Sequence, residues 1–211
     1  MNLTLSIIYL ISTVTFTFGL KFLGHPETAK KGNLISGIGM VLAIIGTLVF
    51  HDIENVPTIN YILIGAALLV GTILGWIMAM KVAMTKMPEL VSLFNGFGGG
   101  SALLIGIIEF RNNVGVEESE KVSAAILATI LSAIVIGSIT FTGSLVAWAK
   151  LDGSMKDLRL PKYNLINNIL FVALIAFSAY IVMMDTDSMV LVYTLLIVSL
   201  IYGYLFVAPI G

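Results

Sequence analysis

Long apolar runs separated by short polar breaks organise this chain from end to end. Each run has about the 20 residues that an α-helix needs to cross a ~30 Å hydrocarbon core at ~1.5 Å per residue. The pattern predicts seven membrane-spanning helices, at about residues 3–20, 33–50, 59–80, 88–110, 122–149, 164–184 and 188–208. We therefore predict an all-α membrane protein, a polytopic helix bundle that forms a single transmembrane domain over residues 1–211.

Composition supports the same class and excludes several functions. Hydrophobic residues make up 58% of the chain and charged residues 11%, whereas soluble domains are about a quarter charged. A net charge of −1 gives no reason to expect a nucleic-acid partner. Cysteine is absent, and His25 and His51 lie in separate breaks, so we expect no metal site.

The charges in the breaks predict the orientation of the chain. The breaks at 21–32, 81–87 and 150–163 lie on one side and hold nine of the eleven Lys and Arg residues. The breaks on the other side hold only Arg111 and Lys121. Because cytoplasmic loops are enriched in basic residues, we expect the amino terminus outside and the carboxyl terminus in the cytoplasm.

Three of the runs carry a stripe of small residues at helical spacing. Such stripes let helix backbones approach closely in lipid, where apolar side chains give no driving force for association. The stripes are Gly32, Ser36, Gly39, Ala43 and Gly46; Ser92, Asn95, Gly99, Ala102 and Gly106; and Ala133, Gly137, Thr140, Ser144 and Ala147. We expect these faces to pack against neighbouring helices.

The segment KMPELVSLFNGFGGGSALL at 86–104 combines glycines with polar residues inside an apolar run. A dinucleotide-binding loop is excluded, because Gly96 and Gly98 are followed by Ser101 where the G-x-G-x-x-G pattern needs glycine, and because no strand precedes them. Pro88 suits the first turn of a helix. Glu89, in the same turn, either compensates the helix dipole or marks the mouth of a polar path.

Asn95 lies about 10 Å deeper than Pro88 along the same helix. Its amide must find partners at that depth, either in a hydrogen bond between helices or in a path that holds water or a protonated group. Thr140 and Ser144 share a face of the fifth run and either bond their own helix carbonyls or line the same path. No ionisable residue lies at the middle of any run. A proton path would therefore need a titrating group from another chain, or would rely on water and amides alone.

Three blocks of the sequence resemble the beta subunit of the proton-translocating NAD(P) transhydrogenase, in its membrane domain. They are GLKFLGHPETAKKGN at 19–33, KVAMTKMPELVSLFNGFGGG at 81–100 and ITFTGSLVAWAKL at 139–151. The resemblance implies that hydride passes between NAD(H) and NADP(H) on soluble domains, while the membrane part conducts the proton. It also implies an alpha-subunit partner, a dimer of alpha/beta units and a bacterial inner (plasma) membrane location.

The resemblance assigns roles to particular residues. Asn95 matches a position where some members carry a histidine central to proton transfer, and members with Asn there place that histidine in the alpha subunit. Ser144 matches a serine of the proton path, and Glu89 matches a glutamate near the cytoplasmic mouth. Gly99 matches a family glycine on the same helix face. The residues themselves, and not the resemblance, add Thr140 to the path, with Gly96 and Gly137 as further packing residues beside it.

The family's beta subunit continues with two more helices and an NADP-binding domain. We therefore expect residues 1–211 to be a part of such a subunit that binds neither NAD nor NADP and contains no catalytic residue for hydride transfer. Two other functions remain open from the residues alone. One is half of a secondary transporter with glycine-rich helices around a small substrate, and the other is a non-catalytic membrane scaffold.

Overall fold

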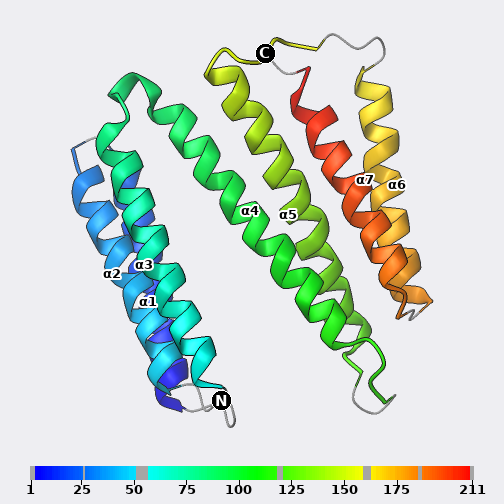
Figure 1. Ribbon diagram of the computed structural model, residues 1–211, viewed down its shortest axis with the longest axis horizontal. Coiled ribbons are helices and arrows are strands. Elements are labelled where there is room, and N and C mark those ends of the chain that lie inside the picture. The colour runs from blue at the N-terminus through cyan, green and yellow to red at the C-terminus, as the bar shows by residue number, and fades with distance from the viewer. Residues whose placement is uncertain are drawn as a thin grey trace. The chain divides into compact units, whose positions relative to one another are not determined.

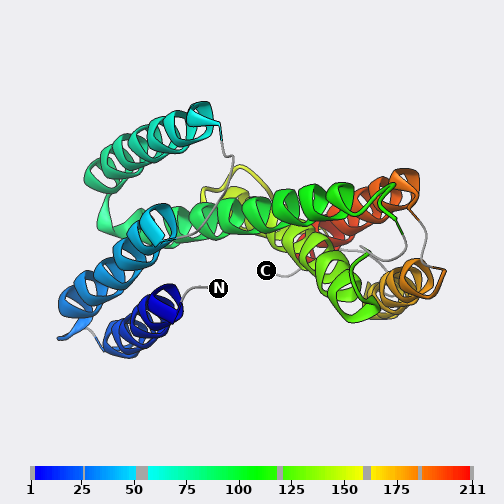
Figure 2. The ribbon, with the colours of Figure 1, turned by 90° about the horizontal axis from the view of Figure 1, so that it is seen from below.

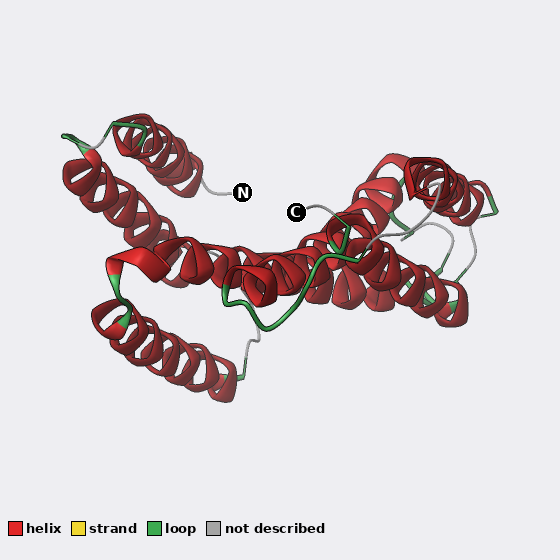
Figure 3. Cartoon of the chain, turned by 90° about the horizontal axis from the view of Figure 1, so that it is seen from above, coloured by secondary structure: helices red, strands yellow, loops and turns green. Residues whose placement is uncertain are grey.

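The computed structural model describes residues 3–25, 27–50, 57–117, 121–158, 163–184 and 187–209. Figure 3 shows only helices and loops in this part of the chain. The helices are α1 (Leu3–Leu23), α2 (Ala29–Phe50), α3 (Thr58–Lys81), η1 (Met84–Lys86), α4 (Met87–Asn112), α5 (Ala124–Leu151), α6 (Tyr163–Met183) and α7 (Met189–Val207).

All seven α-helices of the described residues are long and apolar enough to span a membrane. The predicted all-helical fold class and the seven spans are therefore confirmed. The largest difference at a boundary is at α2, which begins at Ala29 and not at residue 33, because Lys30 and Lys31 continue the helix beyond its apolar part. The chain divides into two compact units, residues 1–72 and 73–211, with the boundary inside α3. The single transmembrane domain over 1–211 stays a prediction.

In the first unit, α1 and α2 pack side by side through small residues (Figure 1). A Cβ atom added at Gly19 would lie 2.5 Å from the Ser36 backbone nitrogen, and one at Gly32 would lie 2.7 Å from the Gly19 carbonyl oxygen. One at Gly39 would lie 2.9 Å from the Ser12 carbonyl oxygen. The small-residue stripe predicted on this helix is thus the face on which the two backbones meet.

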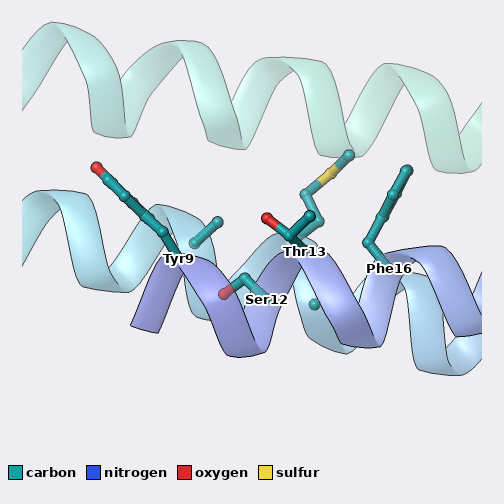
Figure 4. A pocket seen from close by; sticks show the side chains of 7 residues that line it. Tyr9, Ser12, Thr13 and Phe16 are labelled. Atoms are coloured by element: carbon teal, nitrogen blue, oxygen red, sulfur yellow. The ribbon is translucent and has the colours of Figure 1, made fainter. Parts of the chain in front are cut away.

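A hollow of about 260 Å³ lies along the α1/α2 pair. Figure 4 shows Tyr9, Thr13 and Phe16 projecting to the same side of α1, with Ser12 set apart from them. The Tyr9 hydroxyl is hydrogen-bonded to the Thr47 hydroxyl at 2.9 Å, and Thr47 also donates to the Ala43 carbonyl on its own helix. The hydroxyl of Tyr9, the largest polar side chain of this hollow, therefore already has a hydrogen-bond partner within the α1/α2 pair.

In the second unit, α5 is the central helix and packs against α4, α6 and α7 (Figures 1 and 2). The core between these helices is apolar, and its buried members are Phe110, Leu127, Ile130, Leu131, Ile134, Leu174, Ile181, Val192, Leu195 and Tyr202. The backbones of α7 and α5 approach closely where these helices cross, because a Cβ at Gly203 would lie 2.7 Å from the Ile139 carbonyl oxygen. This core holds α5 in place and presents one of its faces to α4.

The loops of the second unit gather at two ends. At one end, Lys86 pairs with Asp152 at 3.3 Å, and the Leu158 N–H donates to the Ala208 carbonyl at 3.0 Å. At the other end, Lys121 pairs with Asp187 at 3.5 Å. The loops that the charge pattern assigned to the same side of the membrane are therefore together in this unit. The assignment of the basic end to the cytoplasm stays a prediction.

Candidate functional site

The candidate site lies where α4 crosses α5, and two glycines bring the backbones together there. A Cβ on Gly99 would lie 2.7 Å from the Phe141 backbone nitrogen and 2.8 Å from the Gly137 carbonyl oxygen. A Cβ on Gly137 would lie 2.6 Å from the Leu103 backbone nitrogen. These approaches are closer than any Cβ tolerates, so the crossing requires glycine on both helices. The polar side chains one turn away on α4 and two turns away on α5 are consequently held within hydrogen-bonding reach.

Asn95 and Ser144 are joined across this crossing. The Asn95 amide nitrogen donates to the Ser144 hydroxyl oxygen at 2.8 Å. On the same side, the Ser92 hydroxyl donates to the Ser144 backbone carbonyl at 2.9 Å. A Cβ on Gly96 would lie 3.3 Å from the Ser144 Cβ, so Gly96 gives this serine its room. Of the alternatives open for Asn95, the structure shows the hydrogen bond between helices.

That hydrogen bond leaves both side chains able to bind something else. Ser144 is buried and accepts from Asn95, so its own hydroxyl proton is free to be donated to another acceptor. Asn95 is exposed on this unit, and its amide oxygen can accept a further hydrogen bond. Nearby hydroxyls behave differently, because Ser138 and Thr142 donate to carbonyls of their own helix. The pair therefore provides both a donor and an acceptor at one point.

A groove of about 640 Å³ follows the α4/α5 crossing next to this pair. It is lined by Phe94, Asn95, Gly98, Gly99, Ala102, Thr129, Ser132, Ala133, Ile136, Gly137 and Thr140. Thr140, which is half-buried, thus shares the groove with Asn95. None of these lining residues is ionisable, which agrees with the absence of an ionisable group at the middle of the spans.

Sequence reasoning passed over two polar residues of this groove, Thr129 and Ser132. Each hydroxyl donates to a carbonyl of its own helix, to Ala125 at 2.9 Å and to Ala128 at 2.7 Å. Their spacing from Gly137 and Thr140 places them on the same face of α5, and this helical periodicity is the signal that could have identified them. They extend the polar lining of the groove away from Asn95.

Glu89 lies at the start of α4, six residues before Asn95, or about 9 Å along the helix. As predicted, it falls in the first turn with Pro88. Lys86 pairs with Glu89 at 3.5 Å and with Asp152 at 3.3 Å, so one lysine connects the start of α4 to the residue after α5. Ser154 donates to Asp152 at 2.6 Å. The groove and this charged cluster lie on the same helix pair.

The cluster influences the protonation of its own members. The hydrogen bond from Ser154, followed by the hydrogen bond and positive charge of Lys86, lowers the pKa of Asp152. The hydrogen bond to Asp152 and the negative charge of Glu89 raise the pKa of Lys86. Both groups are therefore held in their charged forms at neutral pH. In the described part of the chain, no group of three or more His, Asp or Glu residues could hold a metal ion.

Comparisons with known proteins agree with the motif-based resemblance. A model of a family described as NAD(P) transhydrogenase beta subunit matches residues 5–211. A protein named NAD(P) transhydrogenase subunit beta from Rhodospirillum rubrum is 30% identical to this chain over 207 residues. The same-named protein of one strain of that species matches equally well. The match covers 96% of this chain but 43% of each relative, so the chain spans less than half of their length.

Proposed function

Because this chain belongs to the NAD(P) transhydrogenase beta subunit family, we propose that it forms the proton-conducting membrane part of such an enzyme. In the complete enzyme, hydride transfer between NAD(H) and NADP(H) would be coupled to proton movement across the membrane. The observation that carries this proposal is the Asn95–Ser144 hydrogen bond beside a groove on a helix pair long and apolar enough to cross a bilayer. The family match favours this function over a transporter half or a membrane scaffold.

The chemistry of the pair assigns it a relay role and not a titrating one. An amide and a hydroxyl can orient water and pass on a hydrogen bond, but neither changes its charge near neutral pH. The titrating group would be contributed by a helix of the alpha subunit that lies against the groove. Asn95, which is exposed and lines the groove, would contact such a helix through its amide oxygen.

Glu89 would be the cytoplasmic entrance of the path. It lies in the first turn of α4 and is partly exposed. Its carboxylate oxygen is 3.5 Å from the Lys86 ammonium nitrogen. Because Lys86 also binds Asp152 on the other helix, movement of the 150–158 loop would change the surroundings of Glu89. A soluble domain that binds NADP in the remainder of the beta subunit could act on the path through this loop. Coupling requires two states with different affinities for the nucleotide.

The complete enzyme would contain this chain, the remaining helices and NADP-binding domain of the beta subunit, and an alpha subunit that binds NAD. It would work as a dimer of alpha/beta units in the bacterial inner membrane. NAD and NADP would be bound by the soluble domains, and residues 1–211 would hold neither. The packing roles of Gly96, Gly99 and Gly137 would be to keep Asn95 and Ser144 within reach of each other.

The test is proton pumping driven by transhydrogenation in vesicles that hold the complete complex. Asn95→Leu and Ser144→Leu should each abolish most of the coupled rate, because leucine can neither donate nor accept. Ser101→Leu is a matched control on α4, since the Ser101 hydroxyl is exposed and donates to the Phe97 carbonyl of its own helix. Coupled rates that stay unchanged in both Asn95→Leu and Ser144→Leu would overturn the site assignment.

A further inference from the structure

The serine and threonine hydroxyls of α5 differ in where their protons go. Four of them donate to carbonyls of their own helix: Thr129, Ser132, Ser138 and Thr142. Thr140 does not, and its hydroxyl has no hydrogen-bond partner among the described residues. Its oxygen is not enclosed either, because the enclosed and unpartnered side-chain atoms of the described chain are Ser12 Oγ and Asn167 Oδ1. The Thr140 hydroxyl is therefore accessible to a small molecule in the α4/α5 groove.

The wall of this groove offers more hydrogen-bond acceptors than donors. Thr129 and Ser132 are exposed and have used their protons within α5, so each hydroxyl oxygen can only accept. Asn95 donates one N–H to Ser144 and keeps its amide oxygen as an acceptor. Thr140 can accept as well as donate. Because the lining residues carry no charge, the groove suits water and small cations that donate hydrogen bonds, and it disfavours anions.

The groove reaches from Asn95 towards one end of the second unit. Thr129 lies in the second turn of α5, close to the loop whose Lys121 pairs with Asp187. Thr140 lies three turns further along the helix, or about 16 Å at ~1.5 Å per residue. This length is roughly half of a ~30 Å hydrocarbon core. The polar lining therefore covers the distance between the Lys121 end of α5 and the middle of the helix pair.

We propose that water fills this groove and admits protons from the Lys121 end to Asn95. The groove measures about 640 Å³, against roughly 30 Å³ for one water molecule in the liquid, so it has room for a continuous chain. Each water would donate a hydrogen bond to a wall oxygen or to the next water. An entering proton would be passed on as each water accepts one proton and releases another, so no wall group changes its charge. This water route rests on the proposed function and supplies one half of its path.

The experiment is cysteine labelling of the complete complex in vesicles, with a cationic methanethiosulfonate added on the side where Val116→Cys is labelled. The unmodified complex gives the background, since this chain has no cysteine. Ala102→Cys places a thiol in the groove and keeps all of its hydroxyls. Ile105→Cys is the matched control, because Ile105 lies three residues nearer the loop of Val116, is 59% exposed and does not line the groove. We expect Ala102→Cys to react about tenfold faster, because a thiol in lipid stays protonated and the thiolate is the reactive form.

Equal labelling of the two variants, or slower labelling of Ala102→Cys, would show that the groove is dry or filled by another helix and would overturn the proposal. Should Ala102→Cys fail to assemble, Ala133→Cys on the α5 wall takes its place. Labelling requires no turnover, so the two proposals fail separately. A dry groove in a complex that pumps protons overturns the water route alone, whereas unchanged coupled rates in Asn95→Leu and Ser144→Leu overturn the proposed function whatever the labelling.

The acceptor-rich wall is tested in the Ala102→Cys background, by comparing labelling with the cationic reagent and with an anionic methanethiosulfonate. Ser132→Ala removes one wall acceptor and should lower the ratio of cationic to anionic labelling at least about twofold, the loss expected for one weak hydrogen bond. Ser138→Ala is the control, because that hydroxyl is buried and donates within its own helix. It should keep the ratio of Ala102→Cys alone. An unchanged ratio in Ser132→Ala would contradict the role given to the wall.

Discussion

The Asn95 amide nitrogen lies 2.8 Å from the Ser144 hydroxyl oxygen, which joins α4 to a residue 49 positions later on α5. This bond is the polar centre of the α4/α5 crossing. It makes the role of each side chain depend on the presence of the other, so single substitutions at either position report on the pair.

Replacing Ser144 with alanine should impair coupling without disturbing the packing. Ser144→Ala removes the acceptor of the Asn95 amide and leaves the space that Gly96 provides. We expect the coupled proton-pumping rate in vesicles to fall about tenfold, which corresponds to roughly 1.4 kcal/mol. Ser178→Ala is the matched control, since that hydroxyl donates to Leu174 on its own helix. Equal effects of the two substitutions would contradict the relay role.

The close crossing of α4 and α5 should be intolerant of a single methyl group. In Gly99→Ala the new Cβ would meet backbone atoms at 2.7 and 2.8 Å, and overpacking of this kind lowers the free energy of unfolding by about 1–3 kcal/mol. Gly98→Ala should instead be neutral or stabilising by up to about 1 kcal/mol, because its Cβ would meet nothing within 4 Å. Thermal unfolding of the two purified variants measures the difference. A Gly99→Ala protein as stable as Gly98→Ala would show that the helices are further apart.

The Lys86–Asp152 link should be stable over a wide pH range. Ser154 and Lys86 lower the pKa of Asp152. The contribution of Asp152 to the free energy of unfolding is therefore present above its pKa in the unfolded chain, about 3.9, and is lost as pH falls through its pKa in the folded protein. Asp152 and Glu89 raise the pKa of Lys86. The contribution of Lys86 to the free energy of unfolding is therefore complete below its pKa in the unfolded chain, about 10.4, and is lost as pH rises through its pKa in the folded protein. Between these limits, both contributions are fully present, and neither group should make the stability depend on pH.

The corresponding measurement is the melting temperature of the unmodified protein minus that of Lys86→Met at several pH values. The difference should be constant from about pH 5 to pH 9, shrink at both extremes and be smaller at high salt. Lys156→Met serves as the control, because Lys156 is exposed on the loop after α5. A difference that persists at a pH below the folded pKa of Asp152 would count against the ion pair.

The orientation predicted from the basic loops can be checked by chemical labelling. The chain contains no cysteine, so a cysteine introduced at Lys156 or at Val116 would be the one labelled thiol of this chain. A membrane-impermeant maleimide added outside intact cells should label Val116→Cys and spare Lys156→Cys. Permeabilised cells should label both. The reverse pattern in intact cells would place the basic end outside and refute the assignment.

The sequence by itself determined the fold class and the spans. Bilayer thickness sets the length of an apolar helix, and the charged breaks are too polar to enter it, so local composition carried this information. The small-residue stripes were also visible, because helical periodicity depends only on spacing. The start of α4 at Pro88 and Glu89 also followed from local rules for the first turn of a helix.

Only the tertiary structure decided which polar groups meet. The family resemblance assigned Asn95 and Ser144 to one path, but spacing along the chain does not show that they touch, because their contact depends on the glycine crossing at Gly99 and Gly137. The adjacent Asn167 and Asn168 look alike in the sequence, yet one is buried and the other exposed. Neighbouring residues on a helix differ by about 100° in direction, so the packing of α6 against α5 and α7 determines which amide is enclosed.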